Sequence, residues 1–345
     1  MKKVRMAMVG CGFISEIHKT IFEELKDKVE VVATCDTDLQ KAQNMAAMLK
    51  APMAVTNYKE LIGKVDAVLL ALPHHLHHPI GKDFLMNGIH VLMEKPLALD
   101  EKECEDLVAT AEQYNTKLMV AYIMRYHPQI VELKKIIDEK RYGELYQMSI
   151  WTEQYTYVPE GSWMRSAKKL GGGQLFSHGC HYVDLLLWYL GKPLRATHLG
   201  TNFCTPWMEM EGTSNLIMEF EGGRLAYHFG TWGAKGTRHS YAIHAFFEDA
   251  MIECCLNEGK IFLHKTTDLE NYSEKSDVEE LIFECEPTSH LPKYEIEHFV
   301  DCVLNDTAPL TDGKSALKGQ QVIWEIYKAE KENRMADLRG YGFDE

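Results

Sequence analysis

A short glycine turn near the N-terminus has the spacing of a phosphate-binding loop. Gly10-Cys11-Gly12 directly follows the apolar run Val4–Val9 and leads into a helical pattern. Glycine lets the backbone approach a pyrophosphate, and free N–H groups at a helix N-terminus offer it partial positive charge. Ser15 replaces the third glycine of the usual dinucleotide fingerprint and is small enough for close helix–strand packing. The predicted pyrophosphate-binding residues are Gly10, Cys11, Gly12, Phe13 and Ile14.

A carboxylate stands where the second apolar run ends. Asp36 follows Val29–Cys35, and there it could accept hydrogen bonds from both hydroxyls of an adenosine ribose. It would also repel a 2′-phosphate, and no arginine follows it, because Thr37-Asp38 comes next. The pattern therefore predicts NAD rather than NADP, with Asp36 and Thr37 in contact with it. The alternative is a nucleotide-free domain with the same turn.

Two further positions have side chains suited to proton transfer. Lys95 lies at the end of the strand predicted over His90–Met93, at the sheet edge where ligands bind, and its ammonium could hydrogen-bond a reacting hydroxyl. His181 and Asp184 are three residues apart near the start of a predicted helix, so they share a face. Imidazole titrates near neutral pH, and Asp184 would either orient it or bind backbone. The alternatives are that Lys95 is a surface lysine without a role in catalysis and that His181 is a core histidine whose hydrogen bonds are made within the protein.

The run His74-His75-Leu76-His77-His78 raises the question of a metal site. Two adjacent pairs on a tight loop seldom converge on one ion, and no carboxylate or cysteine is near them in sequence. His178 and His181 could join them in space. The spacing matches no known ligand pattern, so we predict no metal site.

The elements that must position these residues fall into two patterns. Residues 4–122 alternate short β-branched runs with helical patterns, which predicts βαβ units and a parallel sheet. The runs expected as strands are Val4–Val9, Val29–Cys35, Val65–Leu72, His90–Met93 and Lys117–Tyr122, and the helices are Phe13–Leu25, Leu39–Leu49, His77–Asn87 and Glu101–Tyr114.

After about residue 145, short strands with period-2 alternation and hairpin turns predominate, which predicts a second, mostly antiparallel domain. The expected strands are Leu145–Gln154, Ala196–Phe203, Thr213–Phe220, Arg224–Trp232, Tyr241–Glu248, Met251–Leu256, Lys260–His264 and Glu280–Glu286. Helices are expected over Gln174–Leu190, Lys293–Leu304 and Lys314–Glu332.

Composition excludes several classes of protein. A chain of 345 residues predicts two domains, and 46% hydrophobic with 26% charged residues is typical of a globular protein. The net charge of −14 argues against a nucleic-acid partner, and no apolar run is long enough for a membrane span. Nine scattered cysteines without a C-x-x-C pair indicate a reducing, cytoplasmic location, and the adjacent Cys254 and Cys255 should point to opposite faces of a strand.

Five motifs occur in order along the chain. They are Leu72-Pro73-His74-His75-Leu76-His77, Glu94-Lys95-Pro96-Leu97, Arg125-Tyr126-His127-Pro128, Gly171-Gly172-Gly173 and Gly179-x-His181-x-x-Asp184. The series resembles the Gfo/Idh/MocA family of sugar and polyol oxidoreductases (glucose–fructose oxidoreductase, inositol dehydrogenase and MocA). The resemblance implies an α/β Rossmann domain plus an α+β C-terminal domain with a large open, mostly antiparallel sheet. It also implies hydride transfer between a carbohydrate C–H and nicotinamide, and homodimers or homotetramers built through the open sheet.

Domain boundaries and residue roles follow from the resemblance. Residues 1–122 would form the NAD-binding domain, with a helix at about 314–333 packing back on it, and residues 123–310 the substrate-binding and oligomerisation domain. The implied catalytic residues are Lys95, His181 and Asp184, and His178, which is new relative to the family pattern, is a further catalytic candidate. Cofactor contacts are implied for Leu72, Pro73, His74, His77, Glu94, Lys95, Arg125 and Trp163, and substrate contacts for Lys95, Tyr155, Arg165, Ser177, His178 and His181. A cis peptide bond between Lys95 and Pro96 is also implied. For the aromatic residues, a place in the core between domains is an equally good interpretation.

One residue departs from the family pattern. The family usually has aspartate four residues before the catalytic histidine, and here Ser177 stands there. Serine cannot act as a carboxylate base, so either His178 takes over a substrate contact or acid–base work falls on Lys95 and His181. We therefore expect altered substrate placement, as for a larger glycoside.

Three functions compete. The leading one is an NAD-dependent dehydrogenase that oxidises a secondary hydroxyl of a sugar, glycoside or cyclic polyol. The second is a redox-neutral epimerase, eliminase or glycoside-cleaving enzyme that works through a transient keto-sugar. The third is a non-catalytic sugar or NAD sensor, against which Lys95, His181 and Asp184 argue.

Overall fold

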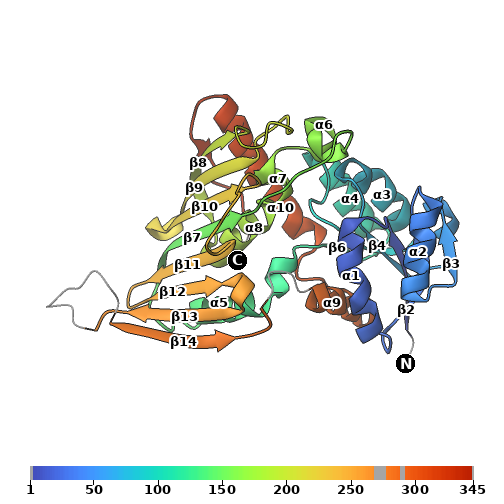
Figure 1. The fold of residues 1–345 in the computed structure, drawn as a ribbon, viewed down its shortest axis with the longest axis horizontal. Coiled ribbons are helices and arrows are strands. Elements are labelled where there is room, and N and C mark those ends of the chain that lie inside the picture. Colours follow the sequence, from blue (N-terminus) through green and yellow to red (C-terminus); the bar gives the residue numbers. More distant parts are fainter. Residues whose placement is uncertain (1–2, 268–276, 288–291, 344–345) are drawn as a thin grey trace. The chain divides into compact units, whose positions relative to one another are not determined.

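The computed structural model describes residues 3–267, 277–287 and 292–343, without the side chains of residues 19 and 20. It divides into two compact units (Figure 1). The first unit comprises Met1–Ile123, Lys168–Gly171 and Leu291–Leu317, and the second comprises Met124–Ala167, Gly172–His290 and Lys318–Glu345.

The first unit is built on a six-stranded sheet in which every neighbouring pair is parallel, in the order β3-β2-β1-β4-β5-β6. Its strands are β1 (Val4–Val9), β2 (Val29–Cys35), β3 (Met53–Val55), β4 (Ala67–Leu70), β5 (His90–Met93) and β6 (Leu118–Val120). Its helices are α1 (Phe13–Glu24), α2 (Leu39–Leu49), α3 (His77–Met86), α4 (Glu101–Gln113) and α9 (Pro292–Asn305), with α6 (Ala167–Leu170) and the 3-10 turns η1 (Tyr58–Leu61) and η2 (His74–Leu76) beside them. This arrangement confirms the predicted Rossmann domain.

The core of this unit lies along the central strands. All four residues of β4 are fully buried, as expected for a strand covered on both faces. The short strand β3 was not predicted from the sequence, because its three residues give no periodicity to detect.

The last two helices differ from the predicted domain boundaries. Helix α9 belongs to the first unit, whereas α10 (Gly313–Lys331), expected at 314–333 on the Rossmann domain, lies in the second unit from Lys318 onward. Hydrogen bonds explain this placement of α10. Tyr327 bonds to Glu211, and Glu330 bonds to His198, both in the second unit.

The second unit contains a nine-stranded sheet in the order β14-β13-β12-β11-β7-β10-β9-β8-β15, antiparallel throughout except for the parallel pair β10 and β7. Its strands are β7 (Leu145–Glu153), β8 (Pro193–Thr201), β9 (Thr213–Phe220), β10 (Leu225–Thr231), β11 (Tyr241–Phe247), β12 (Met251–Cys255), β13 (Lys260–Lys265), β14 (Val278–Glu284) and β15 (Ala336–Asp337). Its helices are α5 (Pro128–Asp138), α7 (Gln174–Ser177), α8 (Cys180–Leu190) and most of α10, and its 3-10 turns are η3 (Ile123–Tyr126), η4 (Trp163–Arg165), η5 (Glu221–Gly223) and η6 (Leu256–Glu258). The predicted large, mostly antiparallel sheet is thus confirmed.

One face of this sheet carries the core. Along β9 the burial alternates, with Leu216, Met218 and Phe220 fully buried and Ile217 half exposed. Helices α5, α7 and α8 pack against strands of the sheet, and Figure 1 shows them beside it. The single helix expected over Gln174–Leu190 is divided in two near Gly179, where a β-carbon would lie 2.7 Å from Leu175 O.

Over the part of the chain described, no helix is both long and apolar enough to span a membrane.

Candidate active site

The glycine turn of the first unit has the geometry that a pyrophosphate site needs. Gly10 has φ +92°, and a β-carbon there would lie 2.2 Å from Ala71 O, so only glycine fits. Ser15 is fully buried and donates to Gly10 O at 2.5 Å. Gly12 precedes α1, a β-carbon on it would have no atom within 4 Å, and no described side chain caps the helix there. The first-turn N–H groups and the open space at Gly12 therefore fit a dinucleotide phosphate.

Asp36 lies beside this turn at the end of β2. Its Oδ2 accepts from Cys11 N at 2.9 Å and its Oδ1 from Asp38 N at 2.9 Å. The carboxylate is therefore fixed next to the glycine turn, where a ribose would follow the pyrophosphate. Burial raises the pKa of the Cys11 thiol to about 12, with a further contribution from Asp36, so this cysteine contributes its backbone rather than a thiolate. Thr37 is exposed.

Lys95 follows β5 at the same edge of the sheet. Because β2, β1, β4 and β5 are parallel neighbours, Asp36, Gly10 and Lys95 all follow carboxyl ends of strands. Lys95 is half-buried, and the peptide bond between it and Pro96 is cis, as the resemblance implied. This edge is where ligands of parallel α/β sheets bind, so the observed placement suits a residue that acts on substrate.

Glu94, next to Lys95, is held by a histidine of α1. Its Oε1 lies 2.8 Å from His18 Nε2, and only 14% of its side chain is exposed. Burial by itself would raise the pKa of Glu94, but the hydrogen bond and charge of His18 bring it below its usual range. Glu94 is therefore an ionised carboxylate beside the lysine.

Two histidines of the His74–His78 run stabilise the loops around Lys95. The Nδ1 and Nε2 atoms of His77 lie 2.7 Å from Pro96 O and 2.9 Å from Leu72 O, so its ring bridges the loops after β4 and β5. His74 Nδ1 lies 2.8 Å from Leu170 O, and burial holds the pKa of His74 well below its usual value. Both rings are buried, and these bonds are to backbone; direct cofactor contacts for His74, His77, Leu72 and Pro73 stay a prediction.

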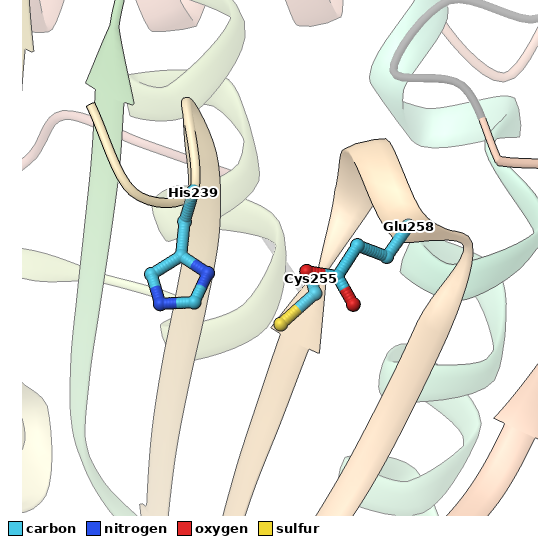
Figure 2. A group of neighbouring side chains, drawn as sticks. All are labelled: His239, Cys255 and Glu258. Carbon is cyan, nitrogen blue, oxygen red and sulfur yellow. The ribbon is translucent and has the colours of Figure 1, made fainter. Parts of the chain in front are cut away.

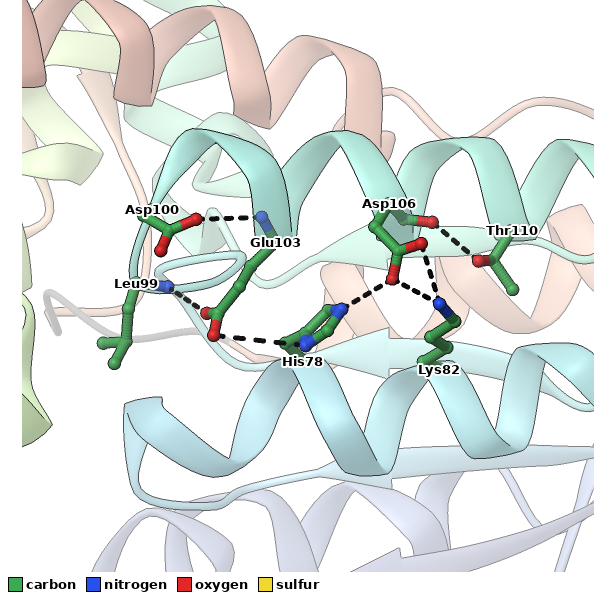
Figure 3. Close-up of polar contacts among 7 residues, drawn as sticks. All are labelled: His78, Lys82, Leu99, Asp100, Glu103, Asp106 and Thr110. Carbon is green, nitrogen blue, oxygen red and sulfur yellow. Dashed lines mark hydrogen bonds and ion pairs between the residues drawn. The ribbon is translucent and has the colours of Figure 1, made fainter.

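His78 of the same run turns to another partner. Figure 3 shows it between α3 and α4, with Nε2 2.6 Å from Asp106 Oδ2, which also binds Lys82. Next to it, Glu103 accepts from Leu99 N, and Asp100 caps α4 by accepting from Glu103 N. This network fixes the segment that follows Pro96. His74, His77 and His78 thus have separate partners.

In the second unit, Arg125 and Asp184 form a buried pair. Arg125 Nε and Nη2 donate to Asp184 Oδ2 and Oδ1 at 2.6 and 2.7 Å, and the guanidinium lies over the rings of Trp188 and Phe343. Burial raises the pKa of Asp184 while the guanidinium lowers it, and the bidentate geometry requires the carboxylate to be ionised. Asp184 was expected to orient His181 or bind backbone; both of its oxygens instead accept from Arg125, itself expected to contact cofactor.

The residues around the Ser177 departure form a polar cluster. Gln174 Nε2 lies 3.3 Å from His178 Nδ1, and Tyr241 OH lies 3.4 Å from His178 Nε2. Gln154 bonds to Tyr241 OH, and Trp232 Nε1 donates to Gln154 Oε1 at 3.1 Å. His178 is thus tied to the strands of the sheet rather than facing solvent.

His181 lies beside this cluster. Its ring centroid is 6.1 Å from that of His178 and 6.3 Å from that of Tyr182, and its side chain is buried. Tyr182 stacks on His228 at 5.3 Å, and burial lowers the pKa of His228 to about 3, which keeps it neutral. His178 and His181 thus lie beside one another among buried aromatic rings, and their roles toward substrate stay predictions.

The cluster contains residues that sequence reasoning missed, namely Gln154, Gln174, Tyr182, His228 and Tyr241. They come from separate strands and helices, so spacing along the chain gives no signal. Polar residues at inward positions of otherwise apolar strands, such as His228 within β10, were the available sign.

A second hydrogen-bonded group explains the Gly171-Gly172-Gly173 motif. Tyr327 OH donates to Glu211 Oε1 at 2.5 Å and accepts from Gly173 N at 3.1 Å, and Leu175 N donates to the same carboxylate. A β-carbon on Gly173 would lie 2.1 Å from the Glu211 carboxyl group. The motif therefore allows a buried carboxylate to cap the start of α7.

The remaining predicted residues lie in the segment after β7. Arg165 donates from Nε and Nη2 to Val158 O at 3.0 and 2.8 Å, so it fixes this loop. Trp163 is half-buried in the turn η4, Ser177 is buried, and Tyr155 is 63% exposed. Their roles toward cofactor and substrate stay predictions.

Comparison with known proteins identifies the family. The family described as an oxidoreductase family with an NAD-binding Rossmann fold matches residues 4–122, and the GFO/IDH/MocA C-terminal domain matches residues 130–253. The chain belongs to the Gfo/Idh/MocA oxidoreductase family. Its first unit is the family's NAD-binding domain, and its cofactor is NAD.

Individual relatives cover part of the chain. A trans-1,2-dihydrobenzene-1,2-diol dehydrogenase from Xenopus laevis is 32% identical over 203 residues, 57% of this chain and 59% of the relative. A 2,7-anhydro-N-acetylneuraminate hydratase from Mediterraneibacter gnavus is 29% identical over 209 residues, 59% of this chain and 54% of the relative. The chain thus spans less than two thirds of the length of these curated relatives.

Among solved structures, the WlbA dehydrogenase from Bordetella pertussis, in complex with NADH and UDP-GlcNAcA, superposes with a TM-score of 0.79. It is 21% identical, with 98% of this chain and 99% of that chain covered. This likeness shows the shared fold.

Proposed function

We propose that this oxidoreductase is an NAD-dependent dehydrogenase that oxidises a secondary hydroxyl of a sugar, glycoside or cyclic polyol. The observation that carries the proposal is the position of Lys95, which follows β5 at the same sheet edge as the glycine turn after β1 and Asp36 after β2. A dinucleotide held by the turn and Asp36 runs along this edge, so a lysine there is suited to act on its substrate.

The chain's own groups would hold the cofactor and move the proton. The N–H groups at the start of α1 would bind the pyrophosphate, and Asp36 the ribose hydroxyls. NAD, when bound, supplies the acceptor for the hydride that leaves the substrate carbon. The Lys95 ammonium would donate a hydrogen bond to the hydroxyl oxygen and polarise it, while the Glu94 carboxylate, fixed by His18, keeps negative charge beside the ammonium. The hydroxyl proton would pass to a neutral imidazole, for which we propose His181.

On the second unit we propose His181 as a further acid–base group and His178 as a substrate contact. The two rings lie 6.1 Å apart, and Gln174 and Tyr241 hold the His178 ring next to that of His181, which supports this proposal. We propose Asp184 as a positioning residue, because both of its oxygens accept from Arg125.

The substrate class rests on relatives. The Xenopus relative is named for a cyclic vicinal diol, and the Bordetella structure holds a sugar nucleotide. Both substrates have secondary hydroxyls on a ring, which agrees with the class proposed here.

A redox-neutral reaction is the second candidate, and the relative named as a hydratase favours it. A transient ketone would acidify the neighbouring C–H, permit elimination or epimerisation, and then take the hydride back. Purified protein would then contain tightly bound NAD(H) and would turn over substrate without net NADH formation. Stoichiometric NADH release with a sugar or glycoside favours the dehydrogenase.

The test of the catalytic assignment is Lys95→Ala. General acid–base groups contribute about 10²–10⁴-fold to rate, so kcat should fall by that factor while NADH affinity, measured by calorimetry, changes less than twofold. Lys102→Ala, at an exposed lysine of α4, is the matched control and should keep both. Near-normal turnover in Lys95→Ala refutes the assignment.

We further propose a homodimer or homotetramer formed through the open face of the nine-stranded sheet. Leu199, Ile217 and Leu225 lie on this face, and they are 74%, 52% and 45% exposed. Light scattering on Ile217→Glu should report a smaller particle than the parent; an unchanged mass contradicts this interface. A cytoplasmic location is proposed because none of the nine cysteines is paired.

A further inference from the structure

Three potential metal ligands converge in the second unit, in a part of the sheet that the proposed reaction does not use. His239 precedes β11, Cys255 ends β12 and Glu258 lies in the turn η6 between β12 and β13. Their ligand atoms all lie within 4.8 Å of one another, and Figure 2 shows one edge of the imidazole and the carboxylate both turned toward the thiol. Among the described residues, this is the group that meets the geometric requirement for an ion.

The ligand types define the ion. A thiolate, an imidazole and a carboxylate together suit Zn²⁺ and related transition metals, whereas Ca²⁺ and Mg²⁺ take oxygen ligands. Tetrahedral zinc needs ligand atoms about 3.5 Å apart, given bonds of about 2.0–2.3 Å. The side chain of Glu258 is exposed and could close the remaining distance by rotation.

The segments that carry the ligands are fixed from several directions. Ser240, next to His239, has φ +58°, and its N–H donates to Thr237 Oγ1 at 3.0 Å. A serine seldom adopts this backbone conformation, and the hydrogen bond to Thr237 helps to hold it in the loop that presents His239.

The opposite side of the group is held by α5. Gln129 is fully buried, and its Nε2 donates to Cys255 O at 3.2 Å and to Lys260 O at 2.7 Å. Gly259, with φ +70°, packs so closely that a β-carbon would lie 2.3 Å from Cys285 O. The turn with Glu258 is thus anchored on both sides, as a preformed ligand set requires.

One polar atom of this group is unsatisfied in a way that a cation would correct. His239 Nδ1 is buried and has no hydrogen-bond partner among the described residues. The neighbouring His244 and His264 face Glu253 instead. Their Nε2 atoms lie 3.5 Å and 3.2 Å from its carboxylate oxygens.

We propose that His239, Cys255 and Glu258 bind one divalent transition-metal ion, Zn²⁺ being the ion that their chemistry favours, with water as the fourth ligand. On binding, the Cys255 S–H bond breaks, its proton passes to solvent, and the sulfur electron pair forms the bond to the ion, with no change of oxidation state. The ion links the loop before β11 to the β12–β13 hairpin, so it stabilises this end of the sheet.

The test uses the full chain, stripped with a chelator and titrated with Zn²⁺ or Co²⁺ alone. We expect one ion per chain, a rise in Tm on binding, and a cobalt–thiolate absorption band. Glu258→Gln, at an exposed position, should weaken Zn²⁺ binding at least about tenfold. Cys255→Ser should abolish the cobalt–thiolate band.

Matched controls separate this site from general effects. Glu221→Gln lies in the turn η5 between β9 and β10, and Cys204→Ser changes an exposed cysteine. Both variants should bind Zn²⁺ as the parent does. Near-UV circular dichroism and urea unfolding, compared with those of the parent, check that the second unit of each variant is folded. Unchanged Zn²⁺ affinity in folded Glu258→Gln and Cys255→Ser overturns the proposal, as does an intact chain that takes up no ion.

Discussion

Gly12→Ala separates the cofactor role of the glycine turn from its structural role. A β-carbon at Gly12 would have no atom within 4 Å, and the residue has φ −90° and ψ −162°, which alanine adopts freely. As the residue that caps α1, alanine is less favourable than glycine by about 0.5–1 kcal/mol. Alanine also reduces the conformational entropy of the unfolded chain, which stabilises the folded state by about 0.4–1 kcal/mol and offsets the first effect. The free energy of unfolding should therefore stay within about 1 kcal/mol of the parent's.

Cofactor binding should respond very differently. The added methyl group would stand where the pyrophosphate approaches the turn, so NADH affinity should fall at least about tenfold, or about 1.4 kcal/mol. Calorimetric titration with NADH and urea unfolding give the two values on the same samples. Gly10→Ala is the contrasting variant: its β-carbon would meet Ala71 O at 2.2 Å, so unfolding should become easier by about 2–5 kcal/mol. If Gly12→Ala binds NADH as the parent does, the pyrophosphate does not pass this residue.

Three further predictions concern buried polar groups. Arg125→Leu leaves Asp184 as an uncompensated buried carboxylate and should cost about 3–5 kcal/mol in urea unfolding; a loss below 1 kcal/mol would contradict the buried pair. Tyr327→Phe removes the hydroxyl that links Glu211 to the start of α7, and it should lower the free energy of unfolding in urea by about 1–3 kcal/mol. An unchanged free energy of unfolding would show that this hydroxyl does not stabilise the fold. Burial raises the pKa of Glu295 well above its usual value, so this residue favours the folded state below the unfolded pKa of about 4.3 and loses that contribution as pH rises toward the folded pKa. Glu295→Gln should therefore flatten the fall in stability above pH 4, and equal pH slopes for parent and variant would argue against a buried neutral Glu295.

Features that depend on neighbouring residues in the sequence could be predicted. Side-chain contacts between residues far apart in the sequence could not. The glycine turn, Asp36 and Lys95 each follow a buried strand, and a strand end in a parallel sheet is where the chain itself specifies a ligand-binding position. The pairing of Arg125 with Asp184 joins residues 59 apart, on different elements, and nothing in their spacing indicates it. Sequence reasoning therefore offered Asp184 only the roles of orienting His181 or binding backbone, and did not find Arg125 as its partner.

Two missed features had local signals. Helix α5 begins with Pro128 at its first turn, capped by the side chain of His127, a start signal that was interpreted only as part of a family motif. The His239, Cys255 and Glu258 group comes from a loop, a strand end and a turn, and no ligand spacing connects them. Tertiary structure alone brings them together.

The most direct test of the central claim measures NADH formation when the purified protein and NAD are mixed with a panel of free sugars, cyclic polyols and glycosides. We expect stoichiometric NADH with at least one secondary-hydroxyl substrate, and loss of this NADH formation in Lys95→Ala, which still binds NADH. Glycosides should turn over faster than free inositol or glucose, because Ser177 stands where the family usually has aspartate and we propose His178 as a substrate contact. Substrate conversion without any NADH release, or equal NADH formation by Lys95→Ala, would contradict the account.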